Sequence, residues 1–398
     1  MGPAAAVPEP PGVPTHAYPR ALLLPGFVNV HTHLELHHLR GAVPEADFVD
    51  WLQHIRRVKE RSDEAAYLEA ALEGVREAWR YGTTTVADTG TSGATVRALA
   101  QLGGRGIYYH EVIAPHPLQA RTAYRRLAAA VERLVREASP SVRIGVSPHA
   151  PYTVAPRLVT RVARFARAHG LPVAAHVAES RAESQFITAG SGPFAQLWRS
   201  RFIPLPGGAR SPVAYCDRLD LLGTDFLAIH VVQTDAEDAA TLARRGCAAA
   251  ICVRSNARHG HGTPPVRRLW DAGVRLGLGT DSVASVADLD LLAEARAVRA
   301  LADLTAEQTV QLLTFEGAEA LGMAHRVGSL DVGKWADLCV LRAPAASDDP
   351  AGSIEAILAT GSPGIVATYV AGRRVHRAGR ADEGGGVRLR SDFPPKRS

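Results

Sequence analysis

The fold of this protein is decided by the stretch Leu22-Leu23-Leu24-Pro25-Gly26-Phe27-Val28-Asn29-Val30-His31-Thr32-His33, an apolar run that ends in two histidines. A short apolar run with β-branched residues predicts a buried strand. Side chains two apart in a strand point to the same side, so both imidazoles can face one cation. A surface or hydrogen-bonded pair is the alternative for His31 and His33, because the chain has 16 histidines. The ends of the other strands decide between these interpretations.

Seven further apolar runs follow along the chain, and each of them ends in polar residues: Thr83–Thr89, Gly106–Ile113, Arg143–Ala150, Pro172–Glu179, Phe226–Gln233, Ala248–Ser255 and Arg275–Ser282. Segments with helical spacing lie between the runs, namely Ala65–Tyr81, Arg121–Ala138, Ala155–His169, Glu237–Gly246 and Leu289–Leu301. Alternating strands and helices are typical of a parallel sheet with crossover helices. Eight such units predict an α/β fold, a (β/α)₈ TIM-like barrel with its active site at the carboxyl ends of the strands.

The length of 398 residues suits one large barrel with a small appendage. We expect the barrel over 21–325, with its last helix over Leu304–Leu321. We expect a small and incomplete β-sandwich appendage over 326–380, with part of 1–20 as a further contributor, because glycine turns separate three expected short strands: Ala336–Leu341, Ile365–Val370 and Arg373–His376. The stretch 381–398 is rich in glycine and arginine, and we expect a disordered tail there.

The ends of the predicted strands carry groups that bind metals. They are His149 after the fourth strand, His176 and Glu179 at the fifth, His230 at the sixth and Asp281 at the eighth. Structural histidines placed independently would not be expected at one strand end after another, whereas imidazole and carboxylate ligands of a divalent metal must converge on the mouth of the barrel. The sequence therefore predicts a metal site. Taken singly, His149 and His230 keep packing or hydrogen bonding as an alternative.

The number of metal ions follows from what the middle strands offer. A barrel with two ions commonly bridges them with a modified lysine or a carboxylate from these strands. None of the three lysines lies between residues 60 and 333, and the fourth strand ends in His149. We therefore expect one metal ion.

The composition excludes several classes of protein. Hydrophobic residues make up 46% of the chain and charged residues 21%, but no apolar run approaches the roughly 18 residues that a membrane span needs. The first 20 residues lack the basic start and the unbroken apolar run of an export signal. Four cysteines without a Cys-x-x-Cys pair indicate reduced thiols in a cytoplasmic protein.

The formal charge of +5 does not by itself indicate a nucleic-acid partner. Lysine occurs only at Lys59, Lys334 and Lys396, and the positive charge is mostly arginine spread along the chain. The densest basic stretch, over 56–61, has no interleaved aromatic residues and is typical of a solvated helix face. We expect neither a nucleic-acid nor a membrane partner, and a homo-oligomer stays open.

Several motifs resemble those of the amidohydrolase superfamily, and together they cover nearly the whole chain: Pro25-Gly26-Phe27-Val28-Asn29-Val30-His31-Thr32-His33, Ser147-Pro148-His149-Ala150-Pro151-Tyr152, His176-Val177-Ala178-Glu179-Ser180, Cys252-Val253-Arg254-Ser255-Asn256, Leu278-Gly279-Thr280-Asp281-Ser282 and the segment 327–338. The pattern is similar to the branch of cytosine deaminases, chlorotriazine hydrolases and adenosylhomocysteine deaminases. It most resembles the aminodeoxyfutalosine deaminases of menaquinone biosynthesis, around 212–215 and 252–256.

The resemblance implies a ligand set and a mechanism. One divalent ion, with zinc favoured over iron or manganese, would be held by His31, His33, His176 and Asp281 and would supply hydroxide from its bound water. Glu179 would move protons between the water, a ring nitrogen and the departing ammonia. His230 would hydrogen-bond the hydroxide or join the ligands, and Asp281 would also receive the proton of the water.

The resemblance gives less guidance on the substrate-binding residues. His149 is expected to contact the substrate. Arg254 and Asn256 are candidates to bind a carboxylate or a ribose, and a structural salt bridge or loop cap is the alternative for them. Glu60 stands where related deaminases have a sugar-binding glutamate, but it lies in a basic segment without the proline of the family, so we do not transfer that role.

The expected activity is hydrolytic deamination of a purine-type heterocyclic amine, with water as the second substrate and aminodeoxyfutalosine as the favoured amine. The alternatives are deamination of 5′-deoxyadenosine, methylthioadenosine, adenosylhomocysteine, guanine or a pterin, and a chlorohydrolase of the same branch. A scaffold without catalysis is the alternative from another class, and the complete ligand set with Glu179 argues against it. Relatives have a longer lead-in before His31, so either this start is late or the C-terminal strands stand alone with exposed edges.

Overall fold

The computed structural model describes residue 12 and residues 15–43, 47–342, 350–378 and 386–390. Eight parallel strands form its central sheet in the order of the sequence: β3 (Phe27–Thr32), β4 (Thr83–Gly90), β5 (Arg105–Val112), β6 (Val142–Pro148), β7 (Val173–Val177), β8 (Phe226–His230), β9 (Ala248–Ile251) and β10 (Arg275–Leu278). Each of them falls within one of the apolar runs of the sequence or extends one residue beyond it. The predicted (β/α)₈ architecture is confirmed.

The barrel closes between its first and last strands. Thr32 and Asp281 form an isolated parallel bridge, and the Asp281 N–H donates to the carbonyl of His31 over 3.0 Å. The Asn29 side chain reinforces the seam, because its amide donates to Thr280 Oγ1 over 2.8 Å. The closure therefore lies at the residues that were predicted to hold the metal.

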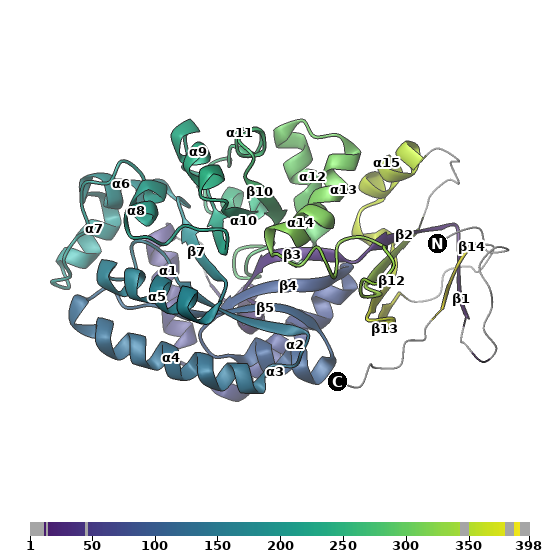
Figure 1. Ribbon diagram of the computed structural model, residues 1–398, viewed down its shortest axis with the longest axis horizontal. Coiled ribbons are helices and arrows are strands. Elements are labelled where there is room, and N and C mark those ends of the chain that lie inside the picture. Colours follow the sequence, from purple (N-terminus) through teal and green to yellow (C-terminus); the bar gives the residue numbers. More distant parts are fainter. Residues whose placement is uncertain (1–11, 13–14, 44–46, 343–349, 379–385, 391–398) are drawn as a thin grey trace.

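Helices surround the barrel (Figure 1). They are α1 (Phe48–Lys59), α2 (Glu64–Arg80), α3 (Ala94–Leu102), α4 (Ala120–Glu137), α5 (Pro156–His169), α6 (Arg181–Ala189), α7 (Gly192–Arg199), α8 (Pro212–Arg218), α9 (Ala236–Arg244), α10 (Val253–Arg258), α11 (Val266–Asp271), α12 (Leu291–Ala302), α13 (Ala306–Leu313), α14 (Phe315–Ala320) and α15 (Pro350–Thr360), with short 3₁₀ turns η2 (Leu34–Leu39), η3 (Pro117–Gln119) and η4 (Ser362–Gly364). Among the described helices, none combines the length and apolarity needed to cross a membrane.

Two predicted elements are each divided in two. The helix predicted over 304–321 breaks at Thr314, where φ is −127° and ψ is −91° and the hydroxyl donates to the Val310 carbonyl over 2.7 Å. The run Leu22–His33 divides at Gly26 into β2 (Ala21–Pro25) and β3. A Cβ at Gly26 would lie 2.2 Å from Thr84 Oγ1, so only glycine fits where the chain enters the barrel.

A small antiparallel sheet takes up the first of these two strands. Its strand order is β13 (Arg373–Arg377), β12 (Ile365–Val370), β11 (Leu338–Arg342) and β2. One of the two alternatives that the sequence left open, that the C-terminal strands stand alone, is therefore wrong: β2 pairs with β11 along their whole length. Because β2 leads directly into the amino end of β3, this sheet lies away from the carboxyl ends of the barrel strands (Figure 1).

The outermost strands form a two-stranded sheet of their own. In it β1 (Thr15–Pro19) pairs antiparallel with β14 (Gly386–Arg390). The latter falls in the stretch expected to be a disordered tail, so the structure differs from that expectation at 386–390. Residues 381–385 and 391–398 of the expected tail lie outside the described residues.

Candidate metal centre

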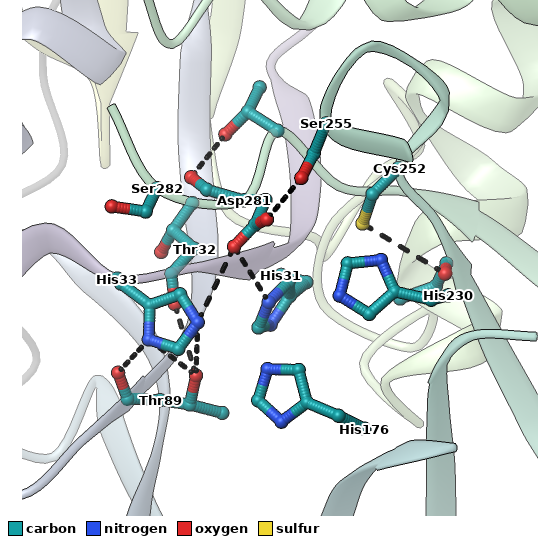
Figure 2. Close-up of polar contacts among 12 residues, drawn as sticks. His31, Thr32, His33, Thr89, His176, His230, Cys252, Ser255, Asp281 and Ser282 are labelled. Carbon is teal, nitrogen blue, oxygen red and sulfur yellow. Dashed lines mark hydrogen bonds and ion pairs between the residues drawn. The ribbon is translucent and has the colours of Figure 1, made fainter. Parts of the chain in front are cut away.

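Four of the predicted ligands meet at the carboxyl ends of the barrel strands (Figure 2). Ring nitrogens of His31, His33 and His176 lie within 4.8 Å of one another. The Asp281 carboxylate faces the first two, with Oδ1 3.4 Å from the Nε2 atom of each ring. Residues from β3, β7 and the turn after β10 thus converge on one point, as the sequence predicted.

Backbone contacts orient two of these imidazoles. Nδ1 of His176 lies 2.9 Å from the carbonyl oxygen of His149, and Nδ1 of His33 lies 3.0 Å from that of Thr89. A carbonyl oxygen can only accept, so each Nδ1 carries the proton and each Nε2 keeps a lone pair for a metal. His31 is 1% exposed, and neither of its ring nitrogens finds a hydrogen-bond partner among the described residues.

The electrostatics of the cluster agree with metal binding. Burial and the neighbouring His31 lower the pKa of His33 to about 3, and burial lowers the pKa of His31 and His176 as well. Burial opposes the charge on Asp281, but the imidazoles beside it hold the pKa of its carboxyl well below the usual range. Three neutral imidazoles and one carboxylate are the protonation states that metal ligands require. This donor set fits a divalent transition metal.

A second possible ligand group shares one histidine with the first. Carboxylate and ring atoms of Glu111, His149 and His176 also lie within 4.8 Å of one another. Because the Nδ1 of His176 is engaged by the His149 carbonyl, only its Nε2 is free for a metal. The two groups therefore share one imidazole nitrogen that can bind one ion at a time. This favours a single ion with alternative ligands over two ions bound together.

Glu179 lies beside the cluster with two histidines around it. Its Oε1 is 3.4 Å from His230 Nε2 and 3.5 Å from His261 Nε2. Burial would raise the pKa of Glu179, but His230 and His261 outweigh it and lower that pKa to about 2. The carboxylate is ionised and can accept a proton.

The backbone around Glu179 is fixed by another buried carboxyl group. Glu183 accepts from the N–H of Ala178 over 2.9 Å and from that of Glu179 over 2.8 Å. Ala178 has φ of +55°, and two other residues at strand ends of the site, His230 and Asp281, have φ of +76° and +63°. Non-glycine residues with positive φ are uncommon and concentrate at functional sites. The local strain places the side chains at the mouth of the barrel.

The structure separates the three residues that were predicted to bind substrate. His149 lines a cavity beside the histidine cluster, and its Nδ1 lies 2.8 Å from Thr153 Oγ1. Asn256 is fully buried, and its Oδ1 accepts from His230 Nδ1 over 2.9 Å, so it orients that imidazole. Arg254 forms an ion pair of 2.9 Å with Asp288. This geometry matches the structural salt bridge that the sequence left open as the alternative to substrate binding for Arg254.

Sequence reasoning missed two residues of the site. Glu111 is the last residue but one of β5 and its side chain is buried, so the alternation of side chains along a strand could have pointed to it. His261 lies in a loop, five residues after Asn256, and it carries no periodic signal. Only the path of the loop brings it to Glu179.

Two adjoining chambers open from the site. The inner one, of about 70 Å³, is lined by Glu111, Glu179 and His230 together with three of the predicted ligands, His33, His176 and Asp281. The outer one has a volume of about 760 Å³ and lies between α1, α7 and the loop after β5. They share five lining residues: Leu52, Ile55, Lys59, His149 and Tyr152. The two chambers therefore adjoin along this wall.

Comparison with known proteins identifies the family. The amidohydrolase family model matches residues 22–375, and the chain belongs to this family. A 5-methylthioadenosine/S-adenosylhomocysteine deaminase of Syntrophobacter fumaroxidans is 32% identical over 333 residues, which cover 80% of this chain and 72% of the relative. The aminodeoxyfutalosine deaminase of Deinococcus radiodurans is 33% identical over 294 residues, covering 71% and 68%.

A solved structure shares the fold. The crystal structure of an adenosine deaminase from Xanthomonas campestris with bound zinc superposes with a TM-score of 0.75 at 27% identity, covering 89% of this chain and 80% of that one. The family assignment confirms the resemblance inferred from the motifs. The protein is a metal-dependent hydrolase that acts on carbon–nitrogen bonds.

Proposed function

We propose that this protein deaminates the 6-amino group of an adenine nucleoside, with aminodeoxyfutalosine as the favoured substrate. The observation that carries the proposal is the Glu179 carboxylate, 3.4 Å from His230 Nε2 and in the same chamber as His33, His176 and Asp281. This arrangement combines a proton carrier with a candidate metal site. Relatives named as deaminases of adenine nucleosides support the choice of substrate class.

One divalent ion, with zinc favoured, would be held by His31, His33, His176 and Asp281, and Glu111 lies within reach as a further ligand. When bound, the ion supplies Lewis acidity that lowers the pKa of water. The three imidazoles are already neutral and need lose no proton on binding.

The chain's own residues then move the protons. Glu179 takes one proton from the attacking water as its oxygen adds to C6 of the purine, and passes it to ring nitrogen N1. A second proton moves from the added hydroxyl through Glu179 or Asp281 to the exocyclic nitrogen. The C6–N bond breaks, ammonia leaves and C6 becomes a carbonyl. The overall reaction converts one nucleoside and one water molecule into one 6-oxo nucleoside and one ammonia molecule.

Three neighbours support these transfers. His230 faces Glu179 with Nε2, and Asn256 accepts from its Nδ1, which fixes the proton on that nitrogen and leaves Nε2 to hydrogen-bond the water. His261 approaches Glu179 from the loop after α10. His149 lines both chambers and is placed to contact the purine.

The experiment is an ammonia-release assay with purified protein of measured metal content. The substrates are aminodeoxyfutalosine, methylthioadenosine, adenosylhomocysteine, 5′-deoxyadenosine and guanine. Turnover of an adenine nucleoside with about one metal per chain is expected, with aminodeoxyfutalosine giving the highest kcat/KM. No ammonia from any adenine nucleoside, with metal bound, would overturn the proposal. A higher kcat/KM for methylthioadenosine would keep the reaction and replace the favoured substrate.

A further inference from the structure

The outer chamber is the feature that the deamination chemistry does not use. Its volume of about 760 Å³ is far larger than the 70 Å³ around the catalytic groups. If C6 of a purine lies beside Glu179, the sugar and its 5′ substituent must extend past the shared wall into this space. The chamber is therefore placed to select the 5′ substituent.

The charge of this chamber is positive. Arg56, Lys59 and Arg201 line it, and Glu60 is the one carboxylate among its lining residues. Glu60 is already paired, since its Oε1 lies 2.8 Å from Nε of Arg56. Within the described part of the chain, no carboxylate lies within ion-pair distance of Lys59 or Arg201. Two cations therefore face the chamber without an acidic partner.

The two cations lie at different depths. Lys59 lines both chambers, and it acts on the buried Glu111, whose pKa burial raises to about 7 against the effect of this ammonium. Arg201 lines only the outer chamber, where its guanidinium lies 5.5 Å from the centre of the Trp198 ring and makes a long contact of 3.4 Å with Gln53. An anion at the far end of a substituent would contact Arg201 and would also be attracted by the charge of Lys59.

Apolar side chains form a further part of the outer chamber's wall. Leu197, Trp198 and Ile203 contribute from α7 and the turn after it, and Ile113 faces them from the loop after β5. Ile113 is 49% exposed although it is a large hydrophobic residue. Burial of these apolar side chains against an aromatic ring or an apolar chain of a ligand would be favourable.

We infer that the outer chamber is a subsite for an aromatic or apolar 5′ substituent that ends in a carboxylate, held by Arg201 with help from Lys59. This inference rests on the proposed deamination and names the substrate class. Aminodeoxyfutalosine has this chemistry, because its 5′ chain ends in a benzoate. A methylthio group would leave both cations without a partner. The ammonium of an amino-acid substituent would lie among the three cations Arg56, Lys59 and Arg201. It would be repelled there, because Glu60 is already paired with Arg56.

The test compares aminodeoxyfutalosine with its methyl ester and with 5′-deoxyadenosine on the full-length protein. We expect kcat/KM for the acid to exceed that for the ester by about tenfold or more, the usual strength of a hydrogen bond to a charged group. In Arg201→Gln this ratio of acid to ester should fall towards one, through KM for the acid. Lys59→Met should reduce the ratio by a smaller factor. Arg57→Gln is the matched control, because Arg57 is exposed on α1 and is absent from the lining of both chambers.

The outcomes separate the two proposals. Equal kcat/KM for acid and ester in the wild type, or an unchanged ratio in Arg201→Gln, overturns the subsite while deamination stands. A loss of the ratio in Arg57→Gln as large as in Arg201→Gln overturns it too, because the effect would then be one of general charge. Lack of activity on every adenine nucleoside overturns the proposed function itself.

Discussion

The inner and the outer chamber share a wall of α1 but differ in the other elements that line them. The inner chamber is lined at its base by residues from strand ends, such as His33, His176 and Asp281, which the barrel hydrogen bonds hold in place. The outer chamber is lined by α1, by α7 with its following turn and by the loop after β5. In a barrel of this kind the strand ends hold the reacting groups, whereas helices and loops around the mouth can differ without disturbing the barrel, and our two proposals divide the chambers in the same way.

The largest effect is expected from removing a ligand in the inner chamber. His176→Ala should abolish metal binding at stoichiometric metal and reduce kcat/KM by on the order of 10³-fold or more, because three ligands no longer converge with Asp281. Metal analysis and ammonia release measure the two effects. Normal metal content with normal turnover in this variant would show that the strand ends do not hold the ion.

Glu179→Gln should separate the metal from the chemistry. The amide cannot accept a proton, so kcat should fall by on the order of 10³-fold while about one metal per chain remains bound. The wild type at the same metal content is the control. Retention of full activity would remove Glu179 from the mechanism.

His261 tests how far a loop residue shares in the chemistry of the inner chamber. In His261→Asn the contact of 3.5 Å with Glu179 is lost, and kcat should fall by about tenfold with little change in KM, as expected of a group that positions the carboxylate. A change in KM alone would place His261 with the substrate-selecting residues. His54→Asn is a matched control from α1, because His54 lines neither chamber.

The smallest effect concerns the framework outside both chambers. Glu77 accepts from His37 over 2.6 Å and from the Leu289 N–H over 3.1 Å, and it forms an ion pair with Arg40. Burial would raise the pKa of Glu77, but His37 and Arg40 lower it to about 2 from 4.5. A lowered pKa stabilises the fold above pH 4.5, and this contribution is lost as the pH falls from 4.5 towards 2.

Glu77→Gln should therefore lower the free energy of unfolding at pH 7 by about 2 kcal/mol, allowing for solvent screening. The difference between variant and wild type should shrink in this acidic range. Urea unfolding at several pH values measures it. A difference that is the same at pH 3 and pH 7 would show that charge does not carry the effect.

Much of the fold and the chemistry could be read from the sequence because both follow short-range rules. Strand periodicity places His31 and His33 on one side, and the barrel rule brings His176, His230 and Asp281 to the same mouth. The same rule applies to Glu111, which was not predicted as a site residue because the apolar run continues beyond it to Ile113. The run over 22–33 was predicted whole, because the contact that divides it at Gly26 comes from Thr84, which is distant in the chain.

The barrel, the family and the convergence of the proposed ligands beside Glu179 follow from the sequence alone, because these depend on periodicity and on residue types at strand ends. Long-range packing was needed to show that Asn256 orients His230, that Arg254 pairs with Asp288, and that His261 reaches Glu179. It also brought Lys59 and Arg201 to one chamber, although they lie far apart in the chain. The physical reason is that loop and helix surfaces meet through long-range packing, which no local pattern encodes.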